Sequence, residues 1–232
     1  MRMPSSRVST AAVLFDFGGT LDADGVPWKA RFSALCRDEG LVTDPARFDP
    51  VFYAADDALV GAVPATLSFA DTVLRLADGL TRGLGSEDAD VGARVARRFL
   101  DDARACLDRN RSLLARLGQR YRLGIVSNFY GNLVTVCHNA SIHELFGVIV
   151  DSTRVGCEKP DPRIFRSALD ALGVAPAEAW FVGDSLPRDM AGARAIGMPH
   201  VWLVGAAGPP AAACCPADPM LRSLGDLEGL LL

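Results

Sequence analysis

Short apolar runs alternate with amphipathic stretches along most of this chain. Five apolar runs rich in β-branched residues predict strands, at residues 11–15, 123–126, 148–150, 179–182 and 200–204. The stretch 162–172 places apolar residues on one helical face and stops at Gly173, and the stretch 186–196 stops at Gly197. Strands that alternate with helices predict an α/β fold whose parallel sheet is covered on both faces.

A long segment without a convincing strand separates the first two predicted strands. It contains helix-like stretches near residues 28–40, 66–82 and 88–106. Breaks between helices are expected at Pro45, Pro50, Pro64 and the segment from Gly83 to Gly85. A parallel crossover needs only about a dozen residues. We therefore predict a Rossmann-like core domain of residues 1–23 and 107–232, with a small α-helical domain of residues 24–106 inserted into it.

The bulk composition is that of an ordinary globular protein. Half of the 232 residues are hydrophobic, which is enough for a sizeable core, and 22% are charged. The net charge of −4 gives no reason to expect binding to nucleic acid or to an anionic membrane. No apolar run approaches the ~20 residues of a membrane span, and the run before Asp16 is too short for a signal peptide.

Cysteine and histidine usage argues against disulfides and zinc. The six cysteines form no CxxC pair, although Cys214 and Cys215 are adjacent, so we expect a reducing, cytoplasmic location. His138, His143 and His200 show no zinc-ligand spacing. Arginines cluster at 94–98 and 109–122, but the interleaved acidic residues favour a solvated helix face over a nucleic-acid patch.

Polar residues suited to phosphoryl chemistry follow the predicted strands directly or after a short loop. The set consists of Asp16, Ser127, Asn128, Lys159, Asp184 and Asp189. Because ligands bind beyond the carboxyl ends of strands in an open parallel sheet, we expect these side chains to converge. A carboxylate can act as a nucleophile or bind Mg²⁺, while a lysine, a hydroxyl and backbone N–H groups can hold phosphate oxygens.

In order and spacing, these segments resemble the four motifs of the haloacid dehalogenase-like (HAD) hydrolases. The motifs are Asp16-Phe17-Gly18-Gly19-Thr20-Leu21, Ser127-Asn128, Lys159-Pro160, and Gly183-Asp184 with Asp189 close behind. The resemblance covers nearly the whole chain, from Ala11 to about Val204. It implies a Rossmann-like core with a helical, C1-type cap inserted after the first strand, in the phosphatase-like branch.

The resemblance also assigns roles to the matching positions. Asp16 would be the catalytic nucleophile that becomes an aspartyl-phosphate, and Lys159 would pair with both the nucleophile and the transferring group. The phosphoryl group would be held by Gly19, Thr20, Ser127, Asn128 and Lys159. Mg²⁺ would be bound by Asp16, Asp184, Asp189 and the backbone carbonyl of Gly18. The implied activity is Mg²⁺-dependent hydrolysis of a small phosphorylated metabolite.

Gly18 departs from the phosphatase pattern, which has a second aspartate two places after the first. In the phosphatases that aspartate protonates the leaving group and later activates water, assistance typically worth about 10²–10⁴-fold in rate. Three consequences are open. The substrate has a good leaving group, such as an acyl phosphate, an aryl phosphate or a pyrophosphate; or Asp22 or Asp24 supplies the acid; or the protein is a weak enzyme with another role.

Two alternatives to a phosphatase follow from the same glycine. Haloacid dehalogenases also lack the second aspartate and need no Mg²⁺, but the Asp184 and Asp189 pair favours the phosphatase. A non-catalytic binding or regulatory protein on the same fold is the other alternative. Pocket-lining candidates in the inserted segment are Trp28, Arg31, Phe52 and Tyr53, although aromatic residues on helices more often belong to a core. The sequence names neither the substrate nor the oligomeric state, monomer or dimer.

Overall fold

A six-stranded parallel sheet forms the centre of the computed structural model, which describes residues 9–208 and 218–232. The strands lie in the order β3-β2-β1-β4-β5-β6. Their bounds are β1 Ala12–Phe15, β2 Arg122–Ser127, β3 Val148–Asp151, β4 Ala179–Gly183, β5 His200–Leu203 and β6 Met220–Leu221. The five predicted strands are confirmed, and the predicted α/β fold class with them. The short edge strand β6 had no visible signal in the sequence.

Helices cover both faces of the sheet because successive residues of each strand point to opposite sides. On one side, Leu14, Val126 and Phe181 pack with Phe165 of α7 (Pro162–Leu172) in a buried cluster that also includes residues of α8 (Ala191–Ala195). On the other, Phe15 joins a larger cluster that includes residues of α5 (Leu133–Asn139) and α4 (Val91–Gly118). α7 begins and ends at the predicted residues, since Asp161 caps its first turn and Gly173 adopts the left-handed conformation at its end.

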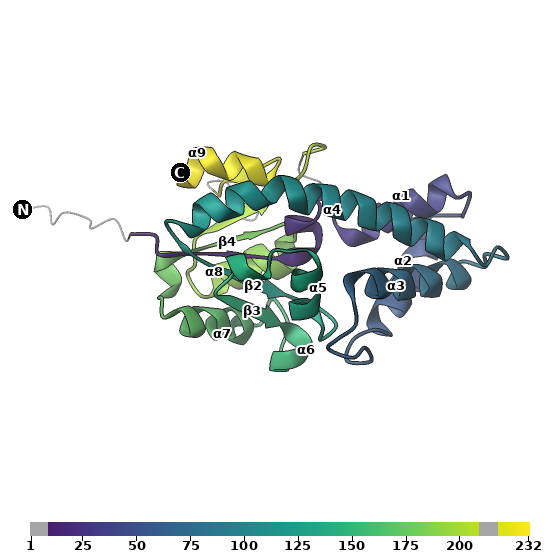
Figure 1. The fold of residues 1–232 in the computed structure, drawn as a ribbon, viewed down its shortest axis with the longest axis horizontal. Helices are drawn as coiled ribbons and strands as arrows, with labels where there is room; N and C mark the ends of the chain where they lie inside the picture. The colour runs from purple at the N-terminus through teal and green to yellow at the C-terminus, as the bar shows by residue number, and fades with distance from the viewer. Residues whose placement is uncertain (1–8, 209–217) are drawn as a thin grey trace, which may run out of the picture.

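The inserted segment folds as helices packed beside the sheet, to the right of it in Figure 1. These cap helices are α1 (Trp28–Asp38), α2 (Pro45–Asp57), α3 (Phe69–Gly83) and the part of α4 (Val91–Gly118) that precedes residue 107. Their buried side chains belong to the same apolar cluster as Phe15. A continuous core therefore joins the sheet to the cap helices, and the edge of the sheet where β1 ends faces the cap.

Two expectations about the inserted segment are wrong. The break expected at Pro45 does separate α1 from α2, since Pro45 occupies the first position of α2 and Asp44 accepts a hydrogen bond from the Ala46 N–H at 3.0 Å. The break expected at Pro50 is absent. Pro50 sits inside α2 and removes only one backbone donor. The helix expected at 88–106 continues to Gly118.

Helix α4 is 28 residues long, which corresponds to about 42 Å, and runs from the cap helices across the sheet. Residues 106 and 107, where the sequence placed the boundary between the two domains, lie in the middle of it. The division of the chain into two domains therefore stays a prediction.

Shorter elements complete the chain. They are the helical turns η1 (Phe17–Leu21), η2 (His143–Leu145), η3 (Pro176–Glu178), η4 (Leu186–Met190) and η5 (Leu224–Leu227), and the helices α6 (Ser152–Val155) and α9 (Glu228–Leu231). Of these, η1 and η4 directly follow β1 and β4 and carry the candidate site.

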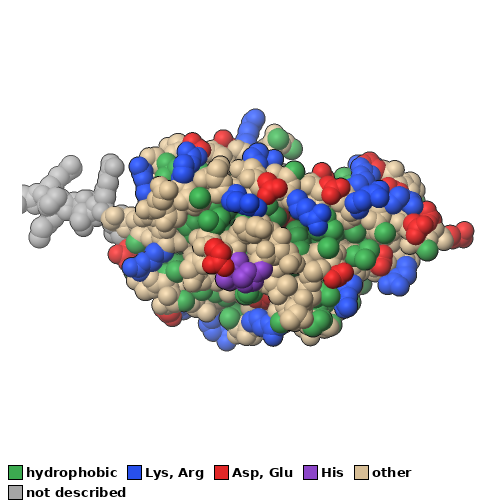
Figure 2. All heavy atoms as spheres, in the orientation of Figure 1, with side chains coloured by type: hydrophobic (Ala, Val, Ile, Leu, Met, Phe, Trp, Pro, Cys, Tyr) green, Lys and Arg blue, Asp and Glu red, His purple; other side chains and the backbone are tan. Residues whose placement is uncertain are grey.

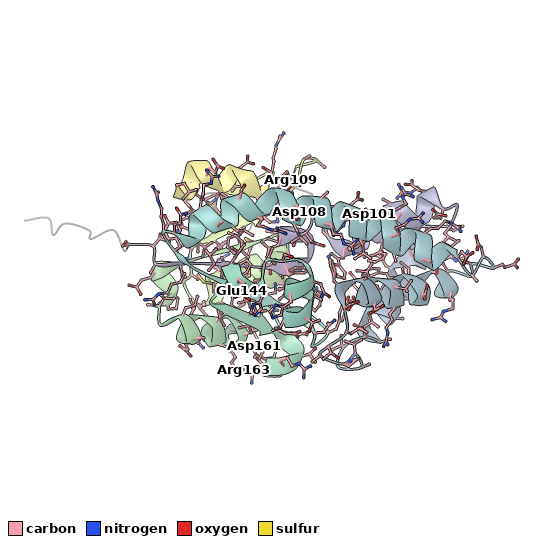
Figure 3. All side chains as sticks on the ribbon, viewed as in Figure 1. Asp101, Asp108, Arg109, Glu144, Asp161 and Arg163 are labelled. Atoms are coloured by element: carbon pink, nitrogen blue, oxygen red, sulfur yellow. The ribbon has the colours of Figure 1, made fainter. Side chains whose placement is uncertain are left out.

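Basic and acidic side chains alternate on the face drawn in Figure 2. Asp108 and Arg109 are neighbours on α4 in Figure 3, and Arg109 pairs with Asp24 at 2.7 Å. Arg111 pairs with Asp108 at 2.9 Å. Within the described ranges, no helix is both long and apolar enough to cross a membrane. The cysteines of those ranges, Cys36, Cys106, Cys137 and Cys157, are free, whereas Cys214 and Cys215 lie outside the described residues.

Candidate active site

The carboxyl ends of β1, β2 and β4 open into a cavity of about 460 Å³ beneath the cap helices. Of the residues that the sequence singled out, the cavity is lined by Asp16, Gly18, Ser127, Asn128, Lys159, Asp184 and Asp189. Gly19 and Thr20 do not line it. The strand-end argument therefore brought the polar groups to one place, because β1 lies between β2 and β4 in the sheet.

The polar floor of the cavity is formed by Asp16, Ser127, Asn128, Lys159, Asp184 and Asp189. Lys159 lies at its centre. Its Nζ lies 2.7 Å from Asp16 Oδ1 and 2.7 Å from Asp189 Oδ1, and only 3% of the residue is exposed. Burial opposes its charge, but the two carboxylates more than offset burial and raise the pKa of Lys159 above its ordinary value. The ammonium group is therefore fixed beside Asp16 and stays charged.

Ser127 and Asn128 hold this arrangement from β2. The Ser127 hydroxyl donates to Asp16 Oδ1 at 2.7 Å. The Asn128 side chain brackets the Lys159 backbone: its Oδ1 accepts from the Lys159 N–H at 2.7 Å, and its Nδ2 donates to the Lys159 carbonyl at 3.1 Å. The Asn128 side chain thus positions Lys159, while its predicted contact with a phosphate stays a prediction.

Asp184 and Asp189 bring further negative charge to the floor. Thr20 Oγ1 donates to Asp184 Oδ1 at 3.1 Å, and the Ser185 N–H donates to Asp189 Oδ2 at 2.9 Å. Burial, and then repulsion by Asp16 and Asp189, raise the pKa of Asp184 well above its usual range. Burial raises the pKa of Asp189 to about 6, although Lys159 pulls it down. The floor is short of positive charge.

Gly19 is the position where the backbone has no room for a side chain. Its φ is +89°, and a Cβ would lie 2.6 Å from Asp184 Oδ2. Only glycine combines that backbone conformation with a carboxylate so close. The glycine therefore lets β1 and β4 bring Asp16 and Asp184 together.

These residues fit a divalent cation. Asp16, Asp184 and Asp189 each offer a carboxylate oxygen, and these oxygens all lie within 4.8 Å of one another. Hard oxygen donors are what Mg²⁺ prefers, and an added cation would balance carboxylates that a single lysine leaves uncompensated. Gly18 keeps the backbone carbonyl that the family pattern uses for the metal.

The missing acid at Gly18 is replaced in space by the indole of Trp28. A Cβ on Gly18 would lie 3.1 Å from Trp28 Nε1, so an aspartate side chain there would meet the ring. Trp28 Nε1 itself donates to Asp22 Oδ2 at 2.8 Å. The indole of Trp28 thus lies where the acid would stand. The sequence had predicted Trp28 only as a pocket-lining or core residue.

Asp22 and Asp24, the nearest acids in sequence, point elsewhere. Asp22 is 1% exposed, accepts from the Gly19 N–H at 2.7 Å and pairs with Arg31 at 2.8 Å. Burial raises the pKa of Asp22 although Arg31 lowers it. Asp24 pairs with Arg109 and accepts from the Leu224 N–H. Neither lines the cavity, so neither stands where a leaving group would depart.

Aromatic side chains form the walls of the cavity. They are Trp28, Phe52, Tyr53, Phe129, Tyr130 and Trp202. The predicted lining residues Trp28, Phe52 and Tyr53 are among them, whereas Arg31 stacks on Phe99 at 3.7 Å and does not line the cavity. Toward the cap, the Tyr130 hydroxyl donates to Asp56 Oδ1. Burial raises the pKa of Asp56, and the nearby Arg188 lowers it.

Several residues of the site were missed by sequence reasoning. Asp56 and Arg188 line the cavity, and Asp151 accepts from the Gly131 and Leu133 N–H groups to fix the loop after Ser127. Asp151 ends β3 just as Asp16 follows β1, so the strand-end rule could have found it. Asp56 carried no such signal, because its helix α2 was not expected.

A second group of possible metal ligands lies on the surface. His138 and His143 stack with ring centroids 3.7 Å apart, and Glu144, labelled in Figure 3, lies 2.9 Å from His143 Nδ1. Sequence spacing gave no hint of this cluster, because its residues meet through the turn after α5.

Comparison with known proteins settles the family. The family model for haloacid dehalogenase-like hydrolases matches residues 10–197, which includes every residue of the polar floor. The chain belongs to the haloacid dehalogenase-like hydrolases. The predicted family is confirmed.

Curated relatives of this HAD hydrolase match only part of it. The mouse (Mus musculus) haloacid dehalogenase-like hydrolase domain-containing protein 3 is 41% identical over 110 residues, 47% of this chain and 43% of that protein. The phosphoserine phosphatase of Thermus thermophilus is 48% identical over 64 residues, 28% of this chain and 26% of that enzyme. The chain thus spans less than half the length of these relatives.

A solved structure shares the fold over the whole chain. A dehalogenase crystal structure superposes with a TM-score of 0.64 at 21% identity and covers 99% of both chains. At this identity the likeness shows the HAD fold and does not separate a dehalogenase from a phosphatase.

Proposed function

We propose that this HAD hydrolase is a Mg²⁺-dependent phosphohydrolase that acts on a small phosphorylated metabolite through an aspartyl-phosphate on Asp16. One observation carries the proposal: a buried lysine lies 2.7 Å from Asp16 Oδ1 in a site that also holds Asp184 and Asp189. This set supplies a nucleophile, a fixed cation and hard metal ligands in one cavity.

Asp16 is prepared to attack as a carboxylate. Ser127 and Lys159 both donate to Asp16 Oδ1 and orient the carboxylate. The same donors would stabilise charge that develops on the phosphoryl oxygens, since they are fixed before the reaction. Gly19 and Thr20 act mainly through Asp184. Gly19 leaves room for the Asp184 carboxylate to approach, and Thr20 donates a hydrogen bond to it.

Asp16, Asp184, Asp189 and the Gly18 carbonyl would hold Mg²⁺. When bound, the ion supplies positive charge that screens the phosphoryl group from the surrounding carboxylates and favours attack at phosphorus. Lys159 keeps Asp189 in place from the other side, at 2.7 Å.

The relatives support a phosphomonoester as the substrate class. The phosphoserine phosphatase of Thermus thermophilus is 48% identical to this chain over 64 aligned residues, which are 26% of that enzyme's length. The substrate is a small molecule, because the cavity of about 460 Å³ lies between the sheet and the cap helices. A cytoplasmic location, from the sequence, stays a prediction.

A dehalogenase would make different use of the floor. It would need to accept an organic carboxylate and release a halide next to Asp16, Asp184 and Asp189 without a metal. Three neighbouring carboxylates against one lysine repel such anions, unless a cation is bound. The charge balance therefore favours the phosphatase.

The test is phosphate release from a panel of phosphate esters and acyl phosphates, with Mg²⁺ and with EDTA. Asp16→Asn, which keeps the size of the side chain, is the blank. We expect release that requires both Mg²⁺ and Asp16. Chloride release from haloacids that survives EDTA would instead establish the dehalogenase, and tight binding of a phosphate mimic without any turnover would establish a binding protein.

A further inference from the structure

The site has a nucleophile but no proton donor at the place where the family acid would stand. Gly18 has no side chain, and the space before it is filled by Trp28, whose Nε1–H is committed to Asp22. Lys159 is held between Asp16 and Asp189. Asp22 and Asp24, the acids nearest to Gly18 in the sequence, do not line the cavity.

We propose that the substrate is the phosphate monoester of a phenol, with the aromatic ring of the leaving group packed against Trp28. This inference rests on the proposed phosphatase function and names its substrate class. A phenol has a pKa near that of tyrosine, about 10, so its anion departs without help from an acid. An alkyl alcohol is far less acidic and would need the missing proton.

The bond changes balance without an added acid. The Asp16 carboxylate attacks phosphorus, the bond between phosphorus and the phenolic oxygen breaks, and its electron pair leaves with the phenolate. Solvent protonates the released phenolate. Water then attacks phosphorus, the electron pair of the Asp16–phosphorus link returns to the carboxylate, and the protons of water go to the phosphate product.

The cavity walls match such a leaving group in shape and chemistry. Trp28 lies against Gly18 and is itself surrounded by Phe129, with ring centroids 5.9 Å apart, and by Tyr130, at 6.4 Å. An aromatic ring placed beyond the scissile bond meets aromatic faces and edges, the arrangement that aromatic pairs prefer. The walls would add nothing specific for a small aliphatic ester.

A pyrophosphate or acyl phosphate would also depart without an acid, but the cavity suits these groups less. A second phosphate needs cations. Apart from Lys159, the cavity is lined by Lys29, which is paired with Asp49 at 2.6 Å, and by Arg188, which lies near Asp56 and lowers the pKa of that carboxyl. Asp56 adds negative charge on the same side. The cap side of the cavity therefore favours a neutral aromatic group over an anionic one.

The missing residue has a second consequence. In the proposed cycle the same acid would have activated water for the second half, and nothing in its place does so. Attack by water is slowed whatever the leaving group, while departure of a phenolate is not. We therefore expect the aspartyl-phosphate to accumulate and phenol to appear in a burst.

The experiment compares three esters on the full-length protein with Mg²⁺: phenyl, benzyl and cyclohexyl phosphate. Phenyl and benzyl phosphate share the ring but differ in leaving group; cyclohexyl phosphate matches phenyl phosphate in size without the aromatic ring. We expect kcat/KM for phenyl phosphate to exceed that for benzyl phosphate by about 10²-fold or more. Benzyl should exceed cyclohexyl phosphate by about two- to ten-fold, the value of an aromatic pair.

Matched variants separate the ring from the chemistry. Trp28→Leu should remove the preference for benzyl over cyclohexyl phosphate and leave the ratio of phenyl to benzyl unchanged. Trp28→Phe, which keeps a ring, should retain both ratios and serves as the control for a damaged fold. A phenol burst of about one equivalent per active site should precede the steady state.

Three outcomes would overturn the proposal. Equal rates for phenyl and benzyl phosphate would mean that a working acid exists. A selective loss of benzyl and cyclohexyl turnover in Asp56→Asn would identify Asp56 as that acid. Acetyl phosphate could also be hydrolysed faster than every aryl phosphate whose leaving group has a similar pKa. That result would identify acyl phosphates as the substrate class. If no ester releases phosphate above the Asp16→Asn blank, the proposed function itself fails.

Discussion

The polar floor of the cavity matches the family pattern, whereas the corner beside Gly18, formed by Gly18, Trp28 and Asp22, departs from it. On the floor, Lys159 is fixed between two carboxylates at 2.7 Å, and every ionic group of the family pattern except one is present. At the corner, that one group is absent and an apolar ring takes its space, 3.1 Å from where a Cβ would be. The proposed nucleophile and metal ligands thus match the family pattern, whereas the position proposed to face the leaving group departs from it.

The two regions also differ in what holds them. The residues of the floor lie at or near the ends of strands, so the register of the sheet determines their relative positions. The corner depends on a contact between η1 and the first cap helix, in which Trp28 and Arg31 both reach Asp22. Changes at the floor should therefore abolish chemistry, whereas changes at the corner should alter which substrates react.

Removal of the floor's cation should have the largest effect. Lys159→Gln leaves Asp16, Asp184 and Asp189 without a counter-charge, so we expect kcat to fall by about 10²–10³-fold. Breaking a buried pair also costs about 3–5 kcal/mol. Kinetics and thermal unfolding check this prediction. Mg²⁺ should raise the melting temperature of this variant more than that of the parent, because the ion replaces the lost charge; an equal rise in both would contradict the charge argument.

The variant Gly18→Asp, which introduces the aspartate of the family pattern, should not restore acid catalysis. Gly18→Asp brings a Cβ to 3.1 Å from the Trp28 indole and forces the ring to shift, so we expect turnover of benzyl phosphate to stay level or to fall by about ten-fold, the loss that a slightly misplaced active site suffers. The double variant with Trp28→Ala provides space and should exceed Gly18→Asp alone. A large gain from Gly18→Asp by itself would show that the indole moves freely and that the corner is not rebuilt.

The bracket between Asn128 and Lys159 should give an intermediate effect. Asn128→Ala removes two hydrogen bonds to the Lys159 backbone, at 2.7 and 3.1 Å, and should lower stability by about 1–3 kcal/mol. We expect kcat to fall with KM nearly unchanged if Asn128 acts by positioning Lys159. A rise in KM alone would instead favour direct contact with the phosphate, as the sequence predicted.

The smallest effect concerns Asp56 on the cap side. Burial raises the pKa of this carboxyl above its ordinary value of 3.8, so the folded state binds its proton more tightly than the unfolded chain. Stability of the parent should therefore fall, relative to Asp56→Asn, as the pH rises from below 3.8 through the raised pKa. Urea unfolding of both proteins at several pH values checks the sign, and a difference that grows in the opposite direction would refute it.

Most of the core was predictable from the sequence because its signals are local. Apolar runs predicted the central strands, an apolar face and Gly173 predicted α7, and the strand-end rule brought Asp16, Ser127 and Asp184 to one edge. Gly19 was predicted to hold the phosphoryl group, which stays a prediction; in the structure the group packed against it is the Asp184 carboxylate.

The cap side was less predictable because its signals depend on tertiary contacts. Pro45 is a break in one context and the first residue of a helix in another, and only the Asp44 cap distinguishes the two. With α2 unseen, Asp56 had no place in the site. The space before Gly18 could not be assigned to Trp28, because nothing in the sequence says which way the first cap helix turns its indole.

The most direct test of the account is to trap the enzyme during turnover. Rapid quenching of the protein with phenyl phosphate and Mg²⁺, followed by digestion and mass spectrometry, reports whether a peptide gains a phosphoryl group. We predict a phosphorylated peptide whose modified residue is Asp16, absent from Asp16→Asn and from EDTA-treated protein. Phosphate release with an unmodified Asp16 at every quench time would contradict the account.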